Sequence, residues 1–228
     1  MKKINVFLML VMLLLSFSAE ARKVKLMVSP EDADIYIDNQ FVGTGTFEMN
    51  IKSMPVVYRV QKTGYFTHES KVMPYDKRKS ISITLREDKY FIGSTPSGLV
   101  NKYITVTIDP KYYTISPDGN LELSKAWRLI NNVLLNYFDE FSASDYHGGY
   151  LQTPWAFKDY GEKMARCRVT VRDISSVDLP AFQIKVSSEI ATKVQAAKDN
   201  YQETDRIPTY LQPMIEELQT RIGGAAKN

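Results

Sequence analysis

The sequence predicts two domains of different class: a small all-β antiparallel sandwich, followed by an α+β domain with helices packed on one face of an antiparallel sheet. Three observations support this. Residues 24–86 contain short stretches in which polar and apolar residues alternate, without helical periodicity. Residues 123–138 carry apolar side chains at the three- and four-residue spacing of a helix. Alternating stretches separated by turns then resume, and a second short helical segment follows near the C-terminus.

The first 21 residues have the features of a secretory signal peptide. Lys2 and Lys3 precede an apolar run over residues 6–17, and the small residues Ala19 and Ala21 follow it. We therefore expect cleavage after Ala21 and export from the cytosol. The alternative is an uncleaved anchor, although the run is shorter than the roughly 20 residues that a membrane-spanning helix needs.

The composition is that of an ordinary soluble protein. The 228-residue chain is 44% hydrophobic and 24% charged, and its formal net charge of +3 gives no argument for nucleic-acid binding. Its one cysteine, Cys167, cannot form an internal disulfide and does not directly follow the signal, so we expect no lipid anchor. We expect this thiol to be buried and inert. An intermolecular disulfide or a nucleophilic role is the alternative.

The first domain is predicted over residues 22–88. Strands are expected over residues 24–28, 35–37, 54–61 and 80–85, with a tight turn at residues 38–40. Residues 43–45 (GTG) are interpreted as a hairpin, since the segment is too short to hold a phosphate. The basic run at residues 76–79 is interpreted as a solvated turn.

Two motifs in this domain resemble a known family. Residues 29–38 (SPEDADIYID) and 62–65 (KTGY) are similar to the opening turn and a later turn of PEGA domains. Pro30, Glu31 and Ala33 match the name-giving motif, while Asp32 replaces its glycine and can still occupy a turn. The resemblance covers about residues 24–86. It implies a bacterial source and a small β-module that mediates binding or spacing at the cell envelope without catalysis.

A joint is expected at residues 89–100, the α+β domain at 101–223 and a short tail at 224–228. After a strand at 103–108 and the helix at 123–138, we expect further strands over residues 141–145, 150–157, 165–173 and 181–190. Tight hairpins are predicted at residues 147–149 and 159–161. Residues 194–206 are expected to form a loop or a helical segment. The last helix should begin at Pro213 and end at Gly223.

Part of the second domain resembles another family by its pattern alone. The helix that carries Trp127 and ends at Tyr137-Phe138 leads into a strand, a glycine turn and a strand with Trp155. This order is similar to the helix-grip domains of envelope proteins, which occur in a lipoprotein of the outer-membrane barrel-assembly complex and its relatives. The resemblance implies an envelope protein with a helix-on-sheet module.

The sequence shows no recognisable catalytic machinery. Its two histidines, His68 and His147, fall in different predicted domains, and no zinc, nucleophile-elbow, phosphate-loop or dinucleotide motif is present. We therefore expect no enzymatic activity, no metal and no cofactor.

The candidate binding residues are aromatic. Tyr146, Tyr150 and Trp155 are our candidates, within a segment from residue 146 to residue 160 that also contains other aromatic side chains. Tyr150 and Trp155 lie five residues apart, so on a regular strand they would point to opposite faces. The cluster has three interpretations: packing in the core, a protein interface, or stacking on sugar rings.

Together these features predict an exported bacterial cell-envelope protein, periplasmic or secreted, that acts as a non-catalytic interaction or scaffold module and binds another envelope protein. The alternative is a glycan- or peptidoglycan-binding protein that uses exposed aromatic side chains. No nucleic-acid partner is expected, and the protein should be soluble after signal cleavage.

Overall fold

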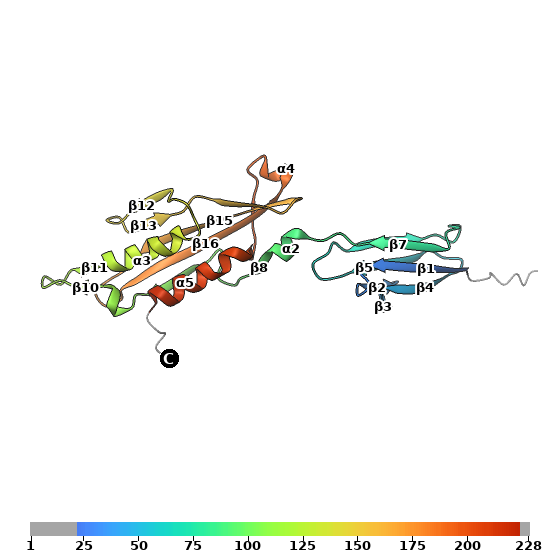
Figure 1. Ribbon diagram of the computed structural model, residues 1–228, viewed down its shortest axis with the longest axis horizontal. Coiled ribbons are helices and arrows are strands. Elements are labelled where there is room, and N and C mark those ends of the chain that lie inside the picture. Colours follow the sequence, from blue (N-terminus) through green and yellow to red (C-terminus); the bar gives the residue numbers. More distant parts are fainter. Residues whose placement is uncertain (1–21, 224–228) are drawn as a thin grey trace, which may run out of the picture. The chain divides into compact units, whose positions relative to one another are not determined.

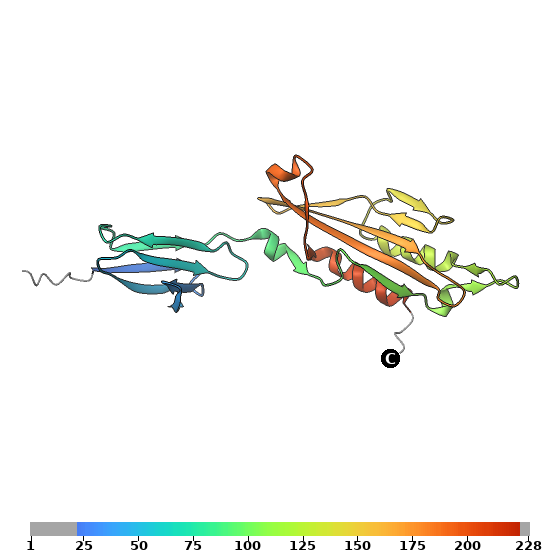
Figure 2. The same ribbon diagram turned by 180° about the vertical axis from the view of Figure 1, so that it is seen from behind.

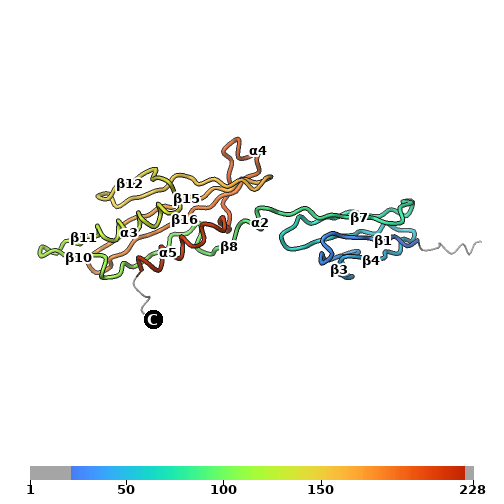
Figure 3. Tube along the Cα trace, viewed as in Figure 1, coloured from blue at the N-terminus to red at the C-terminus, as the bar shows by residue number. Residues whose placement is uncertain are grey.

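The computed structural model describes residues 22–223, which divide into two compact units between Asp88 and Lys89 (Figures 1 and 3). Both units consist mainly of antiparallel sheet, and the longer helices belong to the second. The predicted signal peptide and the predicted tail at 224–228 lie outside the described residues.

The first unit contains two sheets. One has the strand order β4-β1-β7 and the other has the order β3-β2-β5-β6. The strands are β1 (Arg22–Ser29), β2 (Asp34–Ile37), β3 (Gln40–Thr44), β4 (Thr46–Ile51), β5 (Val56–Gln61), β6 (His68–Val72) and β7 (Ser80–Thr84).

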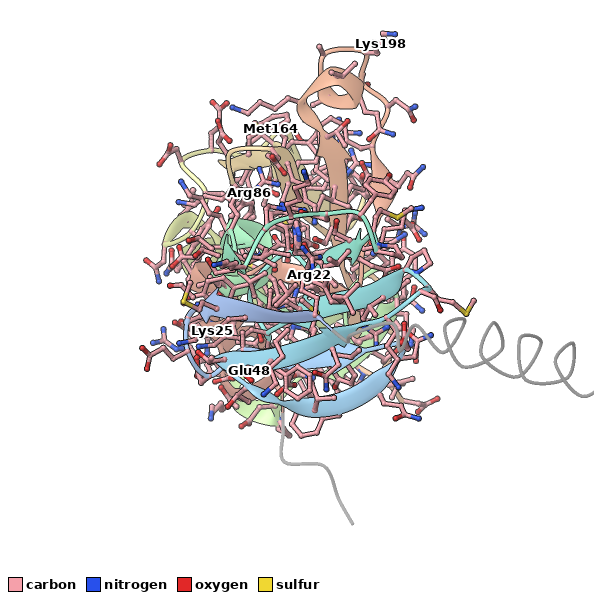
Figure 4. All side chains as sticks on the ribbon, turned by 90° about the vertical axis from the view of Figure 1, so that its right-hand side faces the viewer. Arg22, Lys25, Glu48, Arg86, Met164 and Lys198 are labelled. Carbon is pink, nitrogen blue, oxygen red and sulfur yellow. The ribbon has the colours of Figure 1, made fainter. Side chains whose placement is uncertain are left out.

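The core of this unit lies between the two sheets. Alternate residues along each strand point to the same face, so Val24, Leu26 and Val28 of β1 are all buried. They pack in one cluster with Ile35 of β2 and Val60 of β5. The outer face is polar: Lys25 of β1 stands opposite Glu48 of β4, and both are labelled in Figure 4.

Two details of this unit differ from the prediction. The strand β7 runs parallel to β1, with Leu26 opposite Ile81, so the sandwich is not wholly antiparallel. The interpretation of residues 43–45 as a hairpin is also wrong. The strand β3 pairs with β2, whereas β4 pairs with β1, so these residues carry the chain from one sheet to the other.

The turn at residues 38–40 forms as predicted. Asp38 and Asn39 both have positive φ, 46° and 68°, which is the backbone of the tight turns that join right-twisted strands. The Asp38 carboxylate accepts a hydrogen bond from the backbone N–H of Val57 at 3.0 Å. The hairpin β2–β3 is thereby tied to its neighbour β5.

The second unit is built on one seven-stranded antiparallel sheet. Its central strands, β15 (Lys163–Asp173) and β16 (Ala181–Thr192), pair over their whole length. Around them lie β9 (Tyr103–Thr107), β12 (Ala143–Asp145), β13 (Tyr150–Gln152), β14 (Ala156–Asp159) and β17 (Gln202–Glu203).

Two helices, α3 (Ser124–Leu135) and α5 (Gln212–Ile222), cover one face of this sheet (Figures 1 and 2). The apolar stripe of α3 forms as predicted, with Ala126, Ile130 and Val133 fully buried. It packs with Met214 and Leu218 of α5 on the inward side chains of the sheet. The predicted arrangement of helices on one face is therefore present in this unit.

The segment expected to be a joint, residues 89–100, forms regular structure within the second unit. It contains α2 (Lys89–Gly93) and β8 (Ser94–Pro96), and Val100 is part of the core. The strand β8 pairs with β18 (Arg206–Pro208). The smaller elements are α4 (Lys193–Ala196), the hairpin β10 (Thr114–Ile115) and β11 (Leu121–Glu122), and the 3₁₀ turns η1 (Pro110–Tyr112) and η2 (Thr209–Leu211).

Candidate binding face

The face of the seven-stranded sheet opposite the helices carries a row of arginines. On β15, Cys167 and Val169 point toward α3 and α5 and belong to the core. The pleat therefore directs the alternate residues, Arg166, Arg168 and Arg172, to the other face. Figure 2 shows this face without a helix of the second unit on it.

The strand β16 contributes a fourth cation to the same face. Directly paired residues on antiparallel strands share a face, and Lys185 is paired with Thr170, between Arg168 and Arg172. Glu189 is likewise paired with Arg166. The face thus carries four cations and one carboxylate along its two central strands.

Aromatic rings lie against these cations. The guanidinium carbons of Arg166 and Arg168 are 4.4 Å and 4.3 Å from the centroid of the Trp155 ring. Arg166 also lies 3.9 Å from the centroid of Tyr201. At these distances the ring quadrupole attracts the cation.

A second cluster lies further along the sheet. Tyr103 of β9 has the guanidinium carbon of Arg172 at 4.8 Å and the Nζ atom of Lys185 at 5.8 Å from its ring centroid. Its exposed fraction is 41%. We call Arg166, Arg168, Arg172 and Lys185, with Trp155, Tyr201 and Tyr103, the cationic face.

One end of the cationic face is neutralised by the chain itself. The Nη2 atom of Arg166 lies 2.7 Å from Oε2 of Glu189, and its Nη1 atom lies 2.6 Å from Oδ1 of Asp199. Burial disfavours the charge on Arg166, but these two carboxylates outweigh it and hold the pKa of the guanidinium above its ordinary value. Arg166 is therefore a satisfied, largely structural cation.

The other three cations are not neutralised in this way. Within residues 22–223, Arg168, Arg172 and Lys185 have no carboxylate oxygen within 4.0 Å. The Nε atom of Arg168 is buried and has no hydrogen-bond partner in the same part of the chain. The middle of the face therefore has a surplus of positive charge and of hydrogen-bond donors.

The three sequence candidates do not form one site. Tyr150 is paired with Arg172 on the sheet and its hydroxyl accepts a hydrogen bond from Gln152 at 2.9 Å, so it borders the cationic face. Trp155 is part of that face. Tyr146 lies on the helix side, edge-on to Trp127 with ring centroids 5.8 Å apart.

The expectation that Tyr150 and Trp155 point to opposite faces is wrong, because the strand is not regular between them. Gln152 is paired with Thr170, whereas Ala156 is paired with Cys167. Pro154 and Trp155 therefore both stand opposite Arg168. This one-residue bulge reverses the alternation and brings Trp155 to the face of Tyr150.

Thr153 fixes the bulge. Its backbone N–H donates to the carbonyl of Val169 at 3.0 Å, and its hydroxyl accepts from the N–H of Val169 at 2.9 Å. The side chain thus supplies the acceptor that a regular ladder would take from the backbone. The proline that follows has no N–H to satisfy.

Tyr146 lines a separate surface pocket of about 370 Å³ on the helix side. The other lining residues are Ser124, Trp127, Arg128 and Asn131. The Nδ2 atom of Asn131 donates to the backbone oxygen of Trp127 at 2.6 Å. This pocket combines an aromatic wall with polar groups, and it is open and shallow.

Cys167 is buried on the helix side of the sheet and donates a hydrogen bond to the hydroxyl of Ser188 at 3.2 Å. Burial raises the pKa of its thiol to about 11, against a smaller opposing effect of that hydrogen bond. A protonated, enclosed thiol is a poor nucleophile.

Among residues 22–223, no group of three or more histidine, cysteine, aspartate or glutamate side chains is placed to hold a metal ion. In the same range, no helix is long and apolar enough to cross a membrane. Comparisons with family models, curated proteins and solved structures found no significant match to this chain.

Sequence reasoning missed the four cations, Tyr103 and Tyr201. One signal was present: residues 166–172 (RCRVTVR) place a basic residue at every second position except one. On a strand that spacing gathers the charges on one face. Tyr103 and Tyr201 come from distant parts of the chain and have no such local signal.

Proposed function

We propose that this chain is an exported bacterial cell-envelope protein that acts as a non-catalytic binding module for another envelope protein, with the cationic face as its contact surface. The observation that carries the proposal is the set of three un-neutralised cations beside aromatic rings on a helix-free sheet face. Export rests on the features of residues 1–21.

The composition of the face supports a protein partner. Arginine, tyrosine and tryptophan are enriched at the centres of protein interfaces. Truncating these residues there causes the largest losses of binding free energy. Stacking on Trp155 and Tyr103 also restrains the side chains of Arg168 and Arg172. Side chains that are already ordered lose less conformational entropy when a partner binds.

The PEGA-like first unit fits the same proposal as a second contact or as a spacer. Its sheets end in exposed strands such as β6, where residues 68–71 are all exposed. An extended segment of a partner could add to such an edge through backbone hydrogen bonds.

A glycan-binding role is the second candidate, and the helix-side pocket is the observation that favours it. Trp127 and Tyr146 provide aromatic surface, and Arg128 and Asn131 provide polar groups beside it. The cationic face suits a sugar less well. Two guanidinium groups already stack on the ring of Trp155, which leaves less of it free for a sugar ring.

The two candidates can be separated by affinity capture from an envelope extract of the source bacterium. The bait is the chain without residues 1–21, either unchanged or with the triple change R168Q, R172Q and K185Q. The matched control is the triple change K52Q, K77Q and K125Q, which removes the same charge from exposed lysines elsewhere.

We expect one protein to be captured by the unchanged bait and by the control, and to be lost from the R168Q/R172Q/K185Q bait. Capture that both triple variants retain would contradict the contact surface. Cosedimentation of the bait with peptidoglycan or polysaccharide that is lost in W127A/Y146A, without a captured protein, would favour the second candidate. Circular dichroism of each variant checks that it is folded.

A further inference from the structure

We propose that the cationic face binds an acidic segment of the partner protein through its aspartate or glutamate carboxylates. This inference rests on the proposed function and adds the chemistry of the bound group. It concerns Arg168, Arg172 and Lys185, the part of the face that the chain does not neutralise.

The chain itself shows which group completes such a site. Arg166 and Arg168 lie on the same face of β15 and stack on the same ring of Trp155. Arg166 is bonded to the carboxylates of Glu189 and Asp199, and its side chain is 13% exposed. Two residues further along, Arg168 stands opposite Ser187, which offers no charge. A carboxylate is therefore the group that is present at one end of the row and missing at the other.

Arginine is well suited to binding a carboxylate. Its planar guanidinium can donate two parallel hydrogen bonds to a carboxylate, and these charge-assisted bonds are stronger than neutral ones. A lysine offers a point charge without this geometry. Arg168 and Arg172 are thus expected to orient the bound segment, while Lys185 adds attraction between them.

The spacing of Arg168 and Arg172 defines which positions of the bound segment should be acidic. Arg168 and Arg172 are four residues apart on one strand, which corresponds to about 13 Å at ~3.3 Å per residue. An extended segment that runs along β15 would match them with acidic residues at positions i and i+4. Lys185, on the neighbouring strand beside Thr170, would lie near the middle of that segment.

The aromatic residues favour a peptide over a polyanion without side chains. Tyr103, with an exposed fraction of 41%, and Phe157, with 55%, lie at strand positions paired with Lys185 and Arg166. They offer apolar surface beside the charges. A peptide can place aliphatic or aromatic side chains there, whereas a phosphate polymer cannot.

The test is a titration of the chain without residues 1–21 with synthetic decapeptides, followed by NMR of the arginine Nε–H groups and by calorimetry. The first peptide carries two glutamates at positions i and i+4. The second has glutamines at both positions, and the third has the same two glutamates at i and i+1. Polygalacturonate and inorganic polyphosphate serve as a carboxylate-bearing glycan and a phosphate polymer.

We expect the i, i+4 peptide to shift the Nε–H resonances of Arg168 and Arg172, and the glutamine peptide to leave them unchanged. The R168Q/R172Q/K185Q variant should bind the i, i+4 peptide about tenfold more weakly or worse, as the loss of charge-assisted hydrogen bonds predicts. The K52Q/K77Q/K125Q control should bind it like the unchanged chain. Binding should also weaken as salt is added.

Four results would overturn the inference. The first is that neither glutamate peptide binds. The second and third are that polygalacturonate binds more strongly than the i, i+4 peptide, or that polyphosphate binds as strongly as that peptide. The fourth is self-association of the chain through this face, detected by sedimentation and lost in R168Q/R172Q/K185Q. The proposed function would survive the first of these if the envelope extract still yields a protein whose capture needs the three cations. The face would then bind a partner by other chemistry.

Discussion

The guanidinium carbon of Arg168 lies 4.3 Å from the centroid of the indole ring of Trp155, which is part of a bulge in the sheet of the second unit. The bulge is what makes this contact possible, because it turns Trp155 from the helix side of the sheet to the face that carries the arginines. The candidate binding face therefore depends on one irregular step in the backbone.

Replacing Trp155 should lower the stability of the protein. In W155A the guanidinium groups of Arg166 and Arg168 lose their contacts with the indole ring. We expect the free energy of unfolding to fall by about 1–2 kcal/mol, as two cation–π contacts suggest. W155F keeps a ring and should lose less. Urea denaturation of the two variants measures the difference. Equal losses in W155A and W155F would show that the ring contacts contribute nothing.

The Thr153 hydroxyl should be necessary for the bulge. Thr153 has an exposed fraction of 1%, and T153V removes the acceptor for the N–H of Val169. Leaving a buried donor unpaired costs about 1–3 kcal/mol, and we expect a loss of that size in the free energy of unfolding. T153S keeps the hydroxyl and should remain closer to the unchanged chain. The prediction fails if T153V is as stable as T153S.

The two carboxylates that neutralise Arg166 should contribute unequally to the stability of the protein. The Asp199 side chain is 81% exposed, so water screens its attraction to Arg166, whereas that of Glu189 is 22% exposed. We expect E189Q to lower the free energy of unfolding more than D199N, in chemical denaturation at neutral pH. E189Q should also tighten binding of the i, i+4 glutamate peptide, because it leaves Arg166 with one carboxylate instead of two. Weaker peptide binding by E189Q would argue against carboxylate recognition at this face.

Cys167 should be unreactive in the folded protein. Its thiol is fully buried and its pKa is raised to about 11, so very little thiolate exists at pH 8. We expect no reaction with Ellman's reagent in buffer and one equivalent of reaction in denaturant. Rapid reaction of the folded chain would instead support an intermolecular disulfide or a nucleophilic role.

Stability should fall in alkali because of Tyr160. Burial is the main cause that raises the pKa of its hydroxyl from about 10 to about 12. The folded state therefore holds this proton more tightly than the unfolded state does. Its contribution to stability is complete below pH 10 and is lost as the pH rises toward 12.

The matching variant is Y160F. It should show a flatter decline in the free energy of unfolding between pH 10 and pH 12, and a constant loss at lower pH, because the hydrogen bond from Tyr160 to the backbone oxygen of Gly93 is missing. Denaturation curves at several pH values measure both effects. An unchanged slope in Y160F would assign the alkaline decline to other groups.

Much of the local structure could be predicted from the sequence. The helix α3 has a regular apolar stripe, and β15 and β16 are long alternating strands, so each element has a strong pattern of its own. The strands β4 and β6 were missed. In β6 only Val72 of five residues is buried, so an edge strand of this kind has little alternation for a pattern to detect.

The candidate site was harder to predict. The sequence makes Tyr150 and Trp155 candidate binding residues and places them on opposite faces, because it predicts a regular strand across residues 150–157. The bulge at Pro154 and Trp155 breaks that assumption. Tyr146 is close to them in sequence, but its ring packs on Trp127 on the helix side.

The sequence by itself determined that Arg166, Arg168 and Arg172 share one face of β15, because every second residue of a strand points the same way. Only the tertiary structure decided what surrounds them. Lys185 arrives through the pairing of β16 with β15, and Tyr103 arrives through the pairing of β9 with β16. Tyr201 adjoins β17, which pairs with the far end of β16. Such contacts join residues that are far apart in the chain. Their partners and register depend on how the whole sheet packs against its helices, and a local pattern does not contain that information.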